Sequence, residues 1–99
     1  MNAYMYILLC IDNTYYTGST IDLTFRLWQH NEGLGSNYTK DRLPVELIYY
    51  EEFKRIEDAF NREKQIQKWS RKKKEALIEK NIERLKMLSK NYTQHTPEL

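Results

Sequence analysis

Apolar side chains recur along the chain in two rhythms, and the first of these predicts β-strands. An almost continuous apolar run over Tyr4–Ile11 predicts a strand that is buried on both faces. The turn-forming pair Asp12–Asn13 follows, and the stretch Thr14–Thr17, rich in Thr and Tyr, predicts the returning strand of a hairpin that ends at Gly18. A third strand is predicted over Val45–Phe53.

The second rhythm places apolar residues at steps of three and four and predicts helices. Ser19 or Thr20 can cap a first helix that runs to about Asn31. A second helix is predicted over residues 55–69. Between the first helix and the third strand, residues 32–44 contain two glycines and a proline, which predict a loop.

A last helix is predicted from Arg71 to about Lys90, with Ser70 as its N-cap. Residues 91–99 have no periodicity and are interpreted as a loose tail after a single domain over residues 1–90. The order is strand, strand, helix, strand, helix, helix. With so few strands, a small sheet covered by helices is the natural α+β solution.

One carboxylate interrupts the apolar face of the second predicted helix. Glu63 projects between Ile56 and Phe60, away from the charged side of the helix. The same face carries Ala59, Ile66 and Gln67. A carboxylate aimed at an apolar interior is costly unless a cation or hydrogen-bond donors meet it, so Glu63 should have a partner. On the helix alone, an ion pair with a nearby Arg or Lys is the commoner arrangement, and a functional ligand is the alternative.

Composition limits the class of protein. The 99 residues suffice for one small domain, and 40% of them are hydrophobic and 30% charged. No apolar run reaches the length of a membrane span, and the first residues lack the basic segment of a signal peptide. The single cysteine, Cys10, lies in an apolar run, and no Cys/His cluster has zinc spacing. We therefore expect a cytoplasmic protein without a membrane partner.

The charge is distributed unevenly. Residues 1–53 carry three basic and seven acidic side chains, whereas residues 54–74 carry nine basic and three acidic ones. A basic cluster in an otherwise balanced protein indicates a polyanionic partner. The alternative is a solvated helical face, which is the commoner origin of such runs.

The first predicted helix holds a pair of polar residues suited to phosphate chemistry. Arg26 and His30 are four residues apart and therefore share a face, at the border of the buried side. An Arg fork suits phosphate, and His can pass a proton near neutral pH. Phe25 and Trp28 lie on another side of this helix, where they can stack on exposed bases or, as is commoner for Trp, pack under another element.

Together with the tyrosines of the hairpin, these residues resemble the GIY-YIG nuclease superfamily. Its two name-giving tripeptides correspond to Tyr4-Met5-Tyr6 and Tyr16-Thr17-Gly18, and Arg26, His30 and Glu63 follow in the family's order. The resemblance covers residues 4 to about 75 and is closest to the short single-domain bacterial branch, similar to the nuclease domain of structure-specific endonucleases. The segments Tyr38-Thr39-Lys40, Pro44–Leu47 and Arg62-Glu63 also look like that branch. The resemblance implies a three-stranded antiparallel sheet flanked by helices.

The resemblance also implies roles for the site residues. Glu63 would hold one divalent ion, Mg²⁺ or Mn²⁺. Tyr16 would help deprotonate the attacking water in the field of Arg26, which would also stabilise charge on the phosphate. His30 would position the water or relay the proton, and Tyr6 would complete the polar cluster.

Other positions would support the substrate or distinguish this chain within the family. Gly18 would permit a turn or let a phosphate approach closely. The Lys that some members place after the second tripeptide is replaced by Ser19. Backbone phosphates would be held by a basic set, here called the basic residues: Lys64, Lys68, Arg71, Lys72, Lys73 and Lys74.

The leading hypothesis is therefore an endonuclease that hydrolyses DNA phosphodiester bonds with one divalent metal, acting on branched or single-stranded DNA in repair or recombination. The rival is a repair-accessory module with the same fold that binds nucleic acid and cleaves little, which Ser19 and the acidic first half favour. A third interpretation, a protein-interaction adaptor, rests on small size and the charged last helix. The sequence identifies no protein partner or dimer contact.

Overall fold

A three-stranded antiparallel sheet forms the centre of the first compact unit, which ends at Lys68. The computed structural model describes residues 2–79. Its strands are β1 (Ala3–Leu9), β2 (Tyr15–Thr20) and β3 (Glu46–Phe53), in the order β2-β1-β3. The first strand lies in the middle and pairs antiparallel with both neighbours. The predicted α+β fold and its element order are confirmed.

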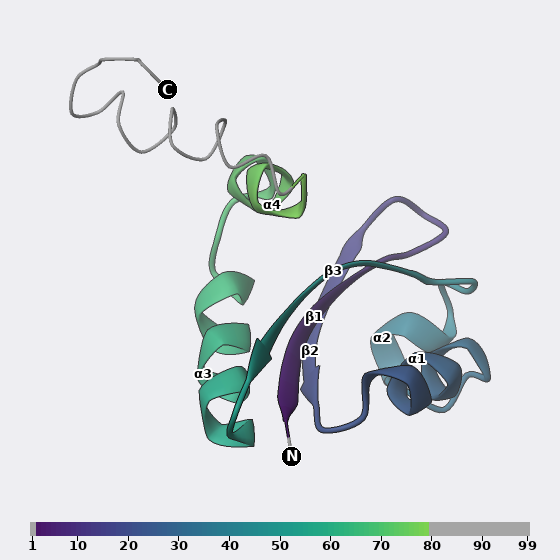
Figure 1. Ribbon diagram of the computed structural model, residues 1–99. Helices are drawn as coiled ribbons and strands as arrows, with labels where there is room; N and C mark the ends of the chain where they lie inside the picture. Colours follow the sequence, from purple (N-terminus) through teal and green to yellow (C-terminus); the bar gives the residue numbers. More distant parts are fainter. Residues whose placement is uncertain (1, 80–99) are drawn as a thin grey trace. The chain divides into compact units, whose positions relative to one another are not determined.

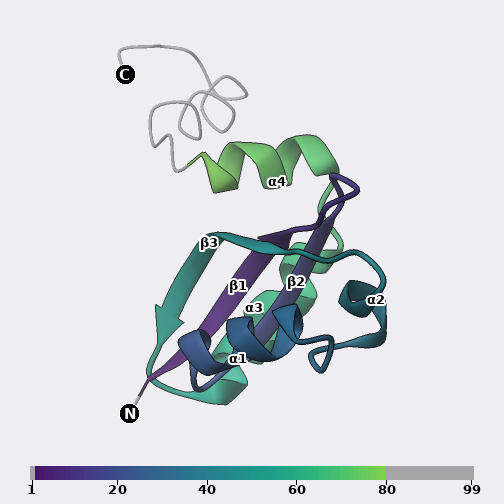
Figure 2. The same cartoon turned by 90° about the vertical axis from the view of Figure 1, so that its right-hand side faces the viewer.

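Helices cover both faces of this sheet. On one face lies α3 (Ile56–Gln67), and on the other lie α1 (Leu23–Asn31) and the short α2 (Asn37–Lys40) (Figures 1 and 2). Because side chains alternate along a strand, β1 supplies both faces, and its residues Met5 to Leu8 are all buried. This confirms a strand that is buried on both faces.

The two faces have separate cores. Toward α1, Tyr6 and Leu8 form a cluster with Cys10 and Val45, against which Leu23 packs. Toward α3, the helix contributes the fully buried side chains of Ala59 and Ile66. The predicted apolar stripe of α3 is only partly correct, because Ile56 and Phe60 are exposed.

The chain between β2 and α1 differs from the prediction. Gly18 does not end the second strand, which continues to Thr20. Ser19 and Thr20 pair with β1 in the sheet and therefore cannot begin the helix. Asp22 is the N-cap instead, since its side chain accepts a hydrogen bond from the backbone N–H of Phe25 at 3.0 Å.

The stretch predicted as a loop over residues 32–44 contains α2. Ser36 caps this turn of helix, its Oγ accepting from the backbone N–H of Thr39 at 3.1 Å. A four-residue helix is too short to show a repeating apolar pattern, so periodicity could not reveal it.

The last described helix is α4 (Arg71–Ile78), in a second compact unit that begins at Trp69. Its predicted cap is confirmed, because the Oγ of Ser70 accepts from the backbone N–H of Lys73 at 3.2 Å. The predicted continuation to Lys90 and the tail over 91–99 lie outside the described residues. Within residues 2–79, no helix has the length and apolar character needed to cross a membrane.

An ion pair fastens α3 to the sheet. Arg62 on α3 donates to the carboxylate of Glu51 on β3 at 2.7 and 3.0 Å, and the hydroxyl of Tyr49 donates to the same carboxylate at 2.6 Å. Burial acts to raise the pKa of Glu51, but the hydrogen bonds from Arg62 and Tyr49 outweigh it and hold that pKa below its usual range. Because Arg62 precedes Glu63, this pair also fixes the rotation of α3 that directs Glu63.

A side-chain amide joins the end of α1 to the start of β3. Asn31 donates to the carbonyl oxygen of Val45 at 3.1 Å and accepts from its backbone N–H at 2.8 Å. We expect Asn31→Ala to lower the free energy of unfolding by about 1 kcal/mol, because both backbone groups lose their partner. Urea denaturation would measure this. The matched control is Glu32→Ala at the exposed neighbouring position, which should change it by less than about 0.5 kcal/mol; equal effects would contradict a role for the amide.

Candidate active site

Three of the predicted site residues meet on the α1 side of the sheet. The Oη of Tyr6 lies 2.8 Å from the Nε2 of His30. The ring of Tyr16 contacts both, with centroid distances of 6.4 Å to Tyr6 and 5.1 Å to His30. Two adjacent strands and α1 thus contribute one side chain each to a single cluster.

His30 is held in the neutral form. Its side chain is fully buried, with 0% exposure. Its second ring nitrogen, Nδ1, lies 2.8 Å from the Oγ1 of Thr39. Burial, assisted by the positive charge of Arg26, lowers the pKa of His30 to about 4. The imidazole is therefore uncharged at neutral pH and bonded at both nitrogens.

Arg26 lies at the edge of this cluster. Its guanidinium donates to the carbonyl oxygen of Gly35 at 2.8 Å and to the side chain of Gln29 at 3.1 Å. Burial raises the pKa of Tyr6 to about 12, while the guanidinium of Arg26 acts in the opposite direction. Tyr6 is therefore a protonated phenol at neutral pH.

Gly18 has a role other than the predicted turn. It lies inside β2, directly opposite Tyr6. A Cβ at this position would lie 2.5 Å from the Oη of Tyr6. The absence of a side chain therefore makes room for the tyrosine ring, and the assignment of Gly18 as a turn residue is wrong.

Glu63 lies on α3 and is buried, with 9% of the residue exposed. Its carboxylate accepts hydrogen bonds from the Oγ of Ser19 at 2.7 Å and from the Nε2 of Gln67 at 2.9 Å. Lys64 comes only within 3.9 Å and is half exposed. The carboxylate thus has the partners that its place in the sequence requires, and neutral donors supply most of them.

The edge strand β2 separates Glu63 from the tyrosine cluster. Tyr16 points to the α1 side, whereas Ser19, on the same strand, reaches Glu63 on the α3 side. The negative charge of Glu63 nevertheless reaches Tyr6, since it contributes to raising the pKa of that phenol. The predicted residues therefore lie on both sides of β2, with Tyr6, Tyr16 and His30 on the α1 side and Glu63 on the α3 side.

The oxygen atoms of Glu63 and its neighbours fit as ligands of a hard divalent cation held by a single carboxylate. Among residues 2–79, no group of three or more His, Cys, Asp or Glu could hold a metal. Glu63 and the Ser19 hydroxyl offer oxygen ligands, and Mg²⁺ is commonly held by one carboxylate together with water and phosphate oxygens. The Oγ1 of Thr17, also on β2, is buried and has no hydrogen-bond partner in the described part of the chain.

The aromatic pair on α1 contradicts the expectation that it packs under another element. Phe25 and Trp28 are 52% and 51% exposed. Their rings stack on one another, with centroids 5.7 Å apart and an angle of 24° between the planes. The pair therefore presents exposed aromatic rings to solvent, on the helix that carries Arg26 and His30.

The basic residues divide between the two compact units. Lys64 on α3 and Lys68, the C-cap of that helix, are exposed, and the remaining four belong to α4. Lys64 lies 4.9 Å from the ring centroid of Phe60, and Lys73 lies 4.2 Å from that of Trp69. These contacts leave the ammonium groups at the surface.

Residues to which the sequence assigned no role in the site complete it. Thr39 and Ser36 support His30, and Tyr38 stacks on Tyr16 with centroids 6.1 Å apart. Ser19 and Gln67 bind Glu63. The segment Tyr38-Thr39-Lys40 resembles the family branch, but its residue types do not predict a contact with His30.

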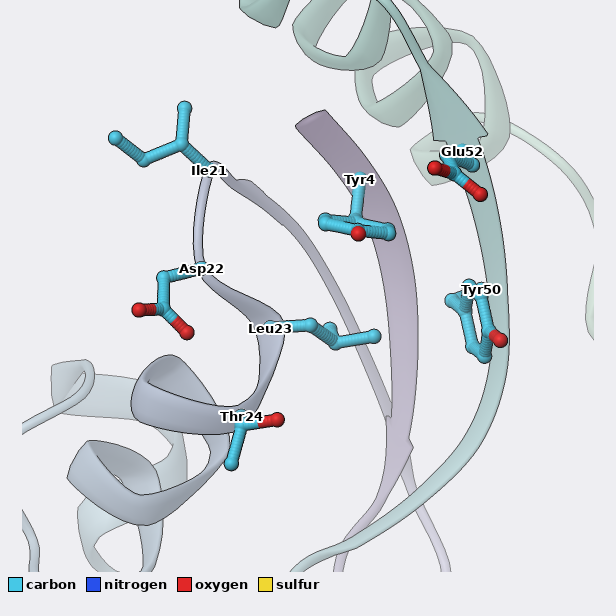
Figure 3. A pocket seen from close by; sticks show the side chains of 7 residues that line it. All are labelled: Tyr4, Ile21, Asp22, Leu23, Thr24, Tyr50 and Glu52. Carbon is cyan, nitrogen blue, oxygen red and sulfur yellow. The ribbon is translucent and has the colours of Figure 1, made fainter. Parts of the chain in front are cut away.

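A separate cavity of about 300 Å³ opens where α1 begins. Figure 3 shows Leu23 extending toward the rings of Tyr4 and Tyr50, with Glu52 on the neighbouring strand. None of the predicted catalytic residues lines it. The Tyr6–Tyr16–His30 cluster and this cavity are therefore distinct features.

Comparison with known sequences agrees with the resemblance. The GIY-YIG catalytic domain matches residues 2–76. A UPF0213 protein from Bacillus pumilus is 46% identical over 78 residues, covering 79% of this chain and 80% of that protein. One from Streptococcus pneumoniae is 44% identical over 82 residues, covering 83% of each. These relatives are short single-domain bacterial proteins, and their names state no activity.

Solved structures support the fold. The solution NMR structure of a UPF0213 protein from Bacillus halodurans is 38% identical, with a TM-score of 0.53, and covers 90% of this chain and 98% of that one. The solution NMR structure of a protein from E. faecalis is 32% identical, with a TM-score of 0.52, and covers 100% of this chain and 95% of that one. Both likenesses extend over nearly the whole of each chain.

The neutral state of His30 predicts how stability depends on pH. An unfolded His takes up a proton near pH 6.5, whereas the folded protein resists protonation until about pH 4. The unfolded state therefore binds more protons in this window, and the free energy of unfolding should fall as the pH drops through it, by up to about 1.4 kcal/mol per pH unit. Urea denaturation at several pH values would measure the slope.

The comparison with His30→Asn isolates the histidine, because carboxylates that titrate in the same range are common to both proteins. We expect the variant to show a shallower decline between pH 6.5 and 4. Parallel curves for the two proteins would show that His30 is protonated as easily in the folded state as in the unfolded chain.

Proposed function

The chain belongs to the GIY-YIG catalytic domain family, and on this premise we propose that it is an endonuclease that hydrolyses DNA phosphodiester bonds with the aid of one divalent metal ion. The observation that carries the proposal is the arrangement around β2. Tyr6, Tyr16 and His30 are in mutual contact on one side of this strand, and the buried carboxylate of Glu63 lies on the other. A small core has little structural reason to bury a carboxylate beside an edge strand.

The burial of each side chain indicates which residues would contact the substrate and which would act through another residue. Tyr6 and His30 are fully buried and would act through their hydrogen bonds. Tyr16 and Arg26 are partly exposed and can meet the substrate. Tyr16 would accept the proton of the attacking water, and Arg26 would stabilise the charge that develops on the phosphate.

Glu63, with the hydroxyl of Ser19 beside it, would hold Mg²⁺ or Mn²⁺. When bound, such an ion polarises the scissile phosphate and stabilises the leaving oxygen. The remaining positions around the ion would be filled by water and by phosphate oxygens of the substrate.

The proposed substrate is DNA that contains unpaired bases, such as single strands or branched structures. The basic residues would hold backbone phosphates without reading sequence. The exposed rings of Phe25 and Trp28 offer a platform for bases that are free of a duplex, since every base has a face that can stack. Paired bases inside a duplex have no free face to offer this platform.

One observation favours the alternative of a nucleic-acid-binding accessory module that cleaves little. Ser19 stands where some family members have a Lys, and its hydroxyl is directed to Glu63. The carboxylate is thereby satisfied within the protein, and a cation near the site is lost. The metal response of Glu63 separates the two functions.

We expect Mn²⁺ to raise the melting temperature of the wild-type protein and to leave that of Glu63→Gln unchanged, because only the wild type binds the ion in its folded state. Without metal the variant should melt near the wild type, since Ser19 and Gln67 are neutral donors and no buried cation is stranded. Glu63→Gln should also lose metal-dependent nicking of flap, fork and single-stranded DNA.

The matched control is Glu57→Gln, which removes an exposed carboxylate from the first turn of the same helix. It should retain both the response to Mn²⁺ and the nicking. A wild type that is indifferent to Mn²⁺, together with a Glu63 variant that melts far below it, would discard the metal site and place the accessory module first.

The aromatic platform gives a prediction about substrate choice. We expect Trp28→Ala and Phe25→Ala each to weaken binding of a labelled single-stranded oligonucleotide by roughly 1–3 kcal/mol, as measured by fluorescence anisotropy, because each removes a stacking surface. Binding of the matching duplex should change little. Thr24→Ala, at an exposed position on the same helix, serves as the control. Equal losses on single strand and duplex would argue against base stacking.

A further inference from the structure

A chain of hydrogen bonds leads from the sheet through His30 to the cap of α2. The Oη of Tyr6 lies 2.8 Å from Nε2 of His30, whose Nδ1 lies 2.8 Å from the Oγ1 of Thr39. The same Oγ1 lies 3.0 Å from the Oγ of Ser36. Tyr6, His30 and Thr39 are all fully buried, and Ser36 is half-buried at the outer end.

One assignment of donors and acceptors satisfies every group in this chain. The Oγ of Ser36 accepts the backbone N–H of Thr39 at 3.1 Å, so it is already placed as an acceptor facing α2. The hydroxyl of Thr39 can donate to that Oγ or to the carbonyl oxygen of Ser36, which leaves its lone pairs for the imidazole. A phenol is a stronger hydrogen-bond donor than a neutral imidazole N–H, which favours donation from Tyr6 to Nε2 over the reverse.

We infer that Thr39 and Ser36 are positioning residues of the candidate site, which hold His30 in the tautomer that carries its proton on Nδ1. In this arrangement Nδ1–H donates to Thr39, Nε2 accepts from Tyr6, and each bond in the chain strengthens the next. In the opposite tautomer Nε2–H would donate to Tyr6, and the hydroxyl of Thr39 would have to turn its proton from Ser36 to Nδ1. The catalytic part of this inference rests on the proposed nuclease function.

The tautomer determines what Tyr6 presents to the rest of the site. Because its proton is committed to His30, the phenolic oxygen keeps its lone pairs for donors on its other side. The positive charge of Arg26 acts on the same phenol and lowers its pKa, against the effect of burial. The hydroxyl pair on α2 would thereby set, through the imidazole of His30, which lone pairs of Tyr6 remain for neighbouring groups.

The loop before α2 supports the same arrangement. Gly35 gives its carbonyl oxygen to Arg26 at 2.8 Å. A Cβ on Gly35 would lie 2.2 Å from Nδ1 of His30, so only glycine leaves room for the imidazole here. Gly35 and Ser36 are neighbours in the sequence. The first accepts a hydrogen bond from Arg26, and the second contacts Thr39, which contacts His30.

Nitrogen NMR of the ¹⁵N-histidine-labelled full chain tests the tautomer directly. His30 and His95 are the two histidines, so His95→Gln leaves His30 as the only imidazole signal. We expect the His95→Gln protein, which is otherwise wild type, to show a protonated Nδ1 and an unprotonated Nε2 of His30 at neutral pH. Thr39→Ser keeps the hydroxyl and should retain this pattern. Thr39→Val cannot accept a hydrogen bond and should shift the signal toward protonated Nε2.

Cleavage measurements on the same proteins test the positioning role. We expect Thr39→Val to lower kcat by about tenfold or more with little change in KM for DNA, as is typical when an outer hydrogen-bond partner of a site residue is lost. Thr39→Ser should restore the rate. Ser36→Ala removes the next link and should give a smaller loss in the same direction, which provides a second variant if Thr39→Val does not fold.

A wild-type His30 protonated on Nε2 would overturn the tautomer assignment, and a Thr39→Val protein with the wild-type pattern would overturn the inference that Thr39 holds this tautomer. A shifted tautomer with an unchanged kcat would overturn the positioning role. The spectrum does not depend on cleavage. If the wild type cuts no DNA while the tautomer behaves as expected, the nuclease proposal fails and the assignment of the hydrogen-bond chain stands.

Discussion

The alternation of side chains across β1 and β2 is the constraint on which the rest of the structure depends. Because helices cover both faces of the sheet, every second residue of the central strand belongs to a different core, and neither core can change register without exposing the other. The candidate site follows the same division. Tyr16 and Ser19 leave one edge strand in opposite directions, the first toward His30 and the second toward Glu63. Because β2 is an edge strand, these groups from the two faces lie along the same border of the sheet.

Much of this could be predicted because the relevant signals are local. The apolar run of β1 and the misplaced carboxylate of α3 are visible in short windows of sequence, and burial of a charge demands a partner wherever it occurs. The partners themselves were not predictable. Ser19 lies far from Glu63 in the chain, and only the pairing of β2 with β1 turns its hydroxyl toward α3. Residue type and spacing carry no information about such a contact.

The errors have physical causes as well. The sequence predicts that Gly18 ends its strand, because glycine is common in turns, but its missing side chain accommodates a ring from the neighbouring strand. Asp22 displaced Ser19 and Thr20 as a helix cap because those two residues remain in the sheet ladder. In each case a long-range contact overrode a local preference.

The fastening of α3 by Arg62 and Glu51 has a consequence for motion. The helix that holds Glu63 is joined to β3 by side chains, whereas the His30 cluster is buried under a different helix on the opposite face. A local opening of α3 would therefore expose Glu63 and leave the imidazole and its hydrogen bonds in place. Amide hydrogen exchange would register such an opening as a loss of protection confined to α3. The ion pair thus contributes, together with the buried Ala59 and Ile66, to how often the Glu63 side of the candidate site is in place.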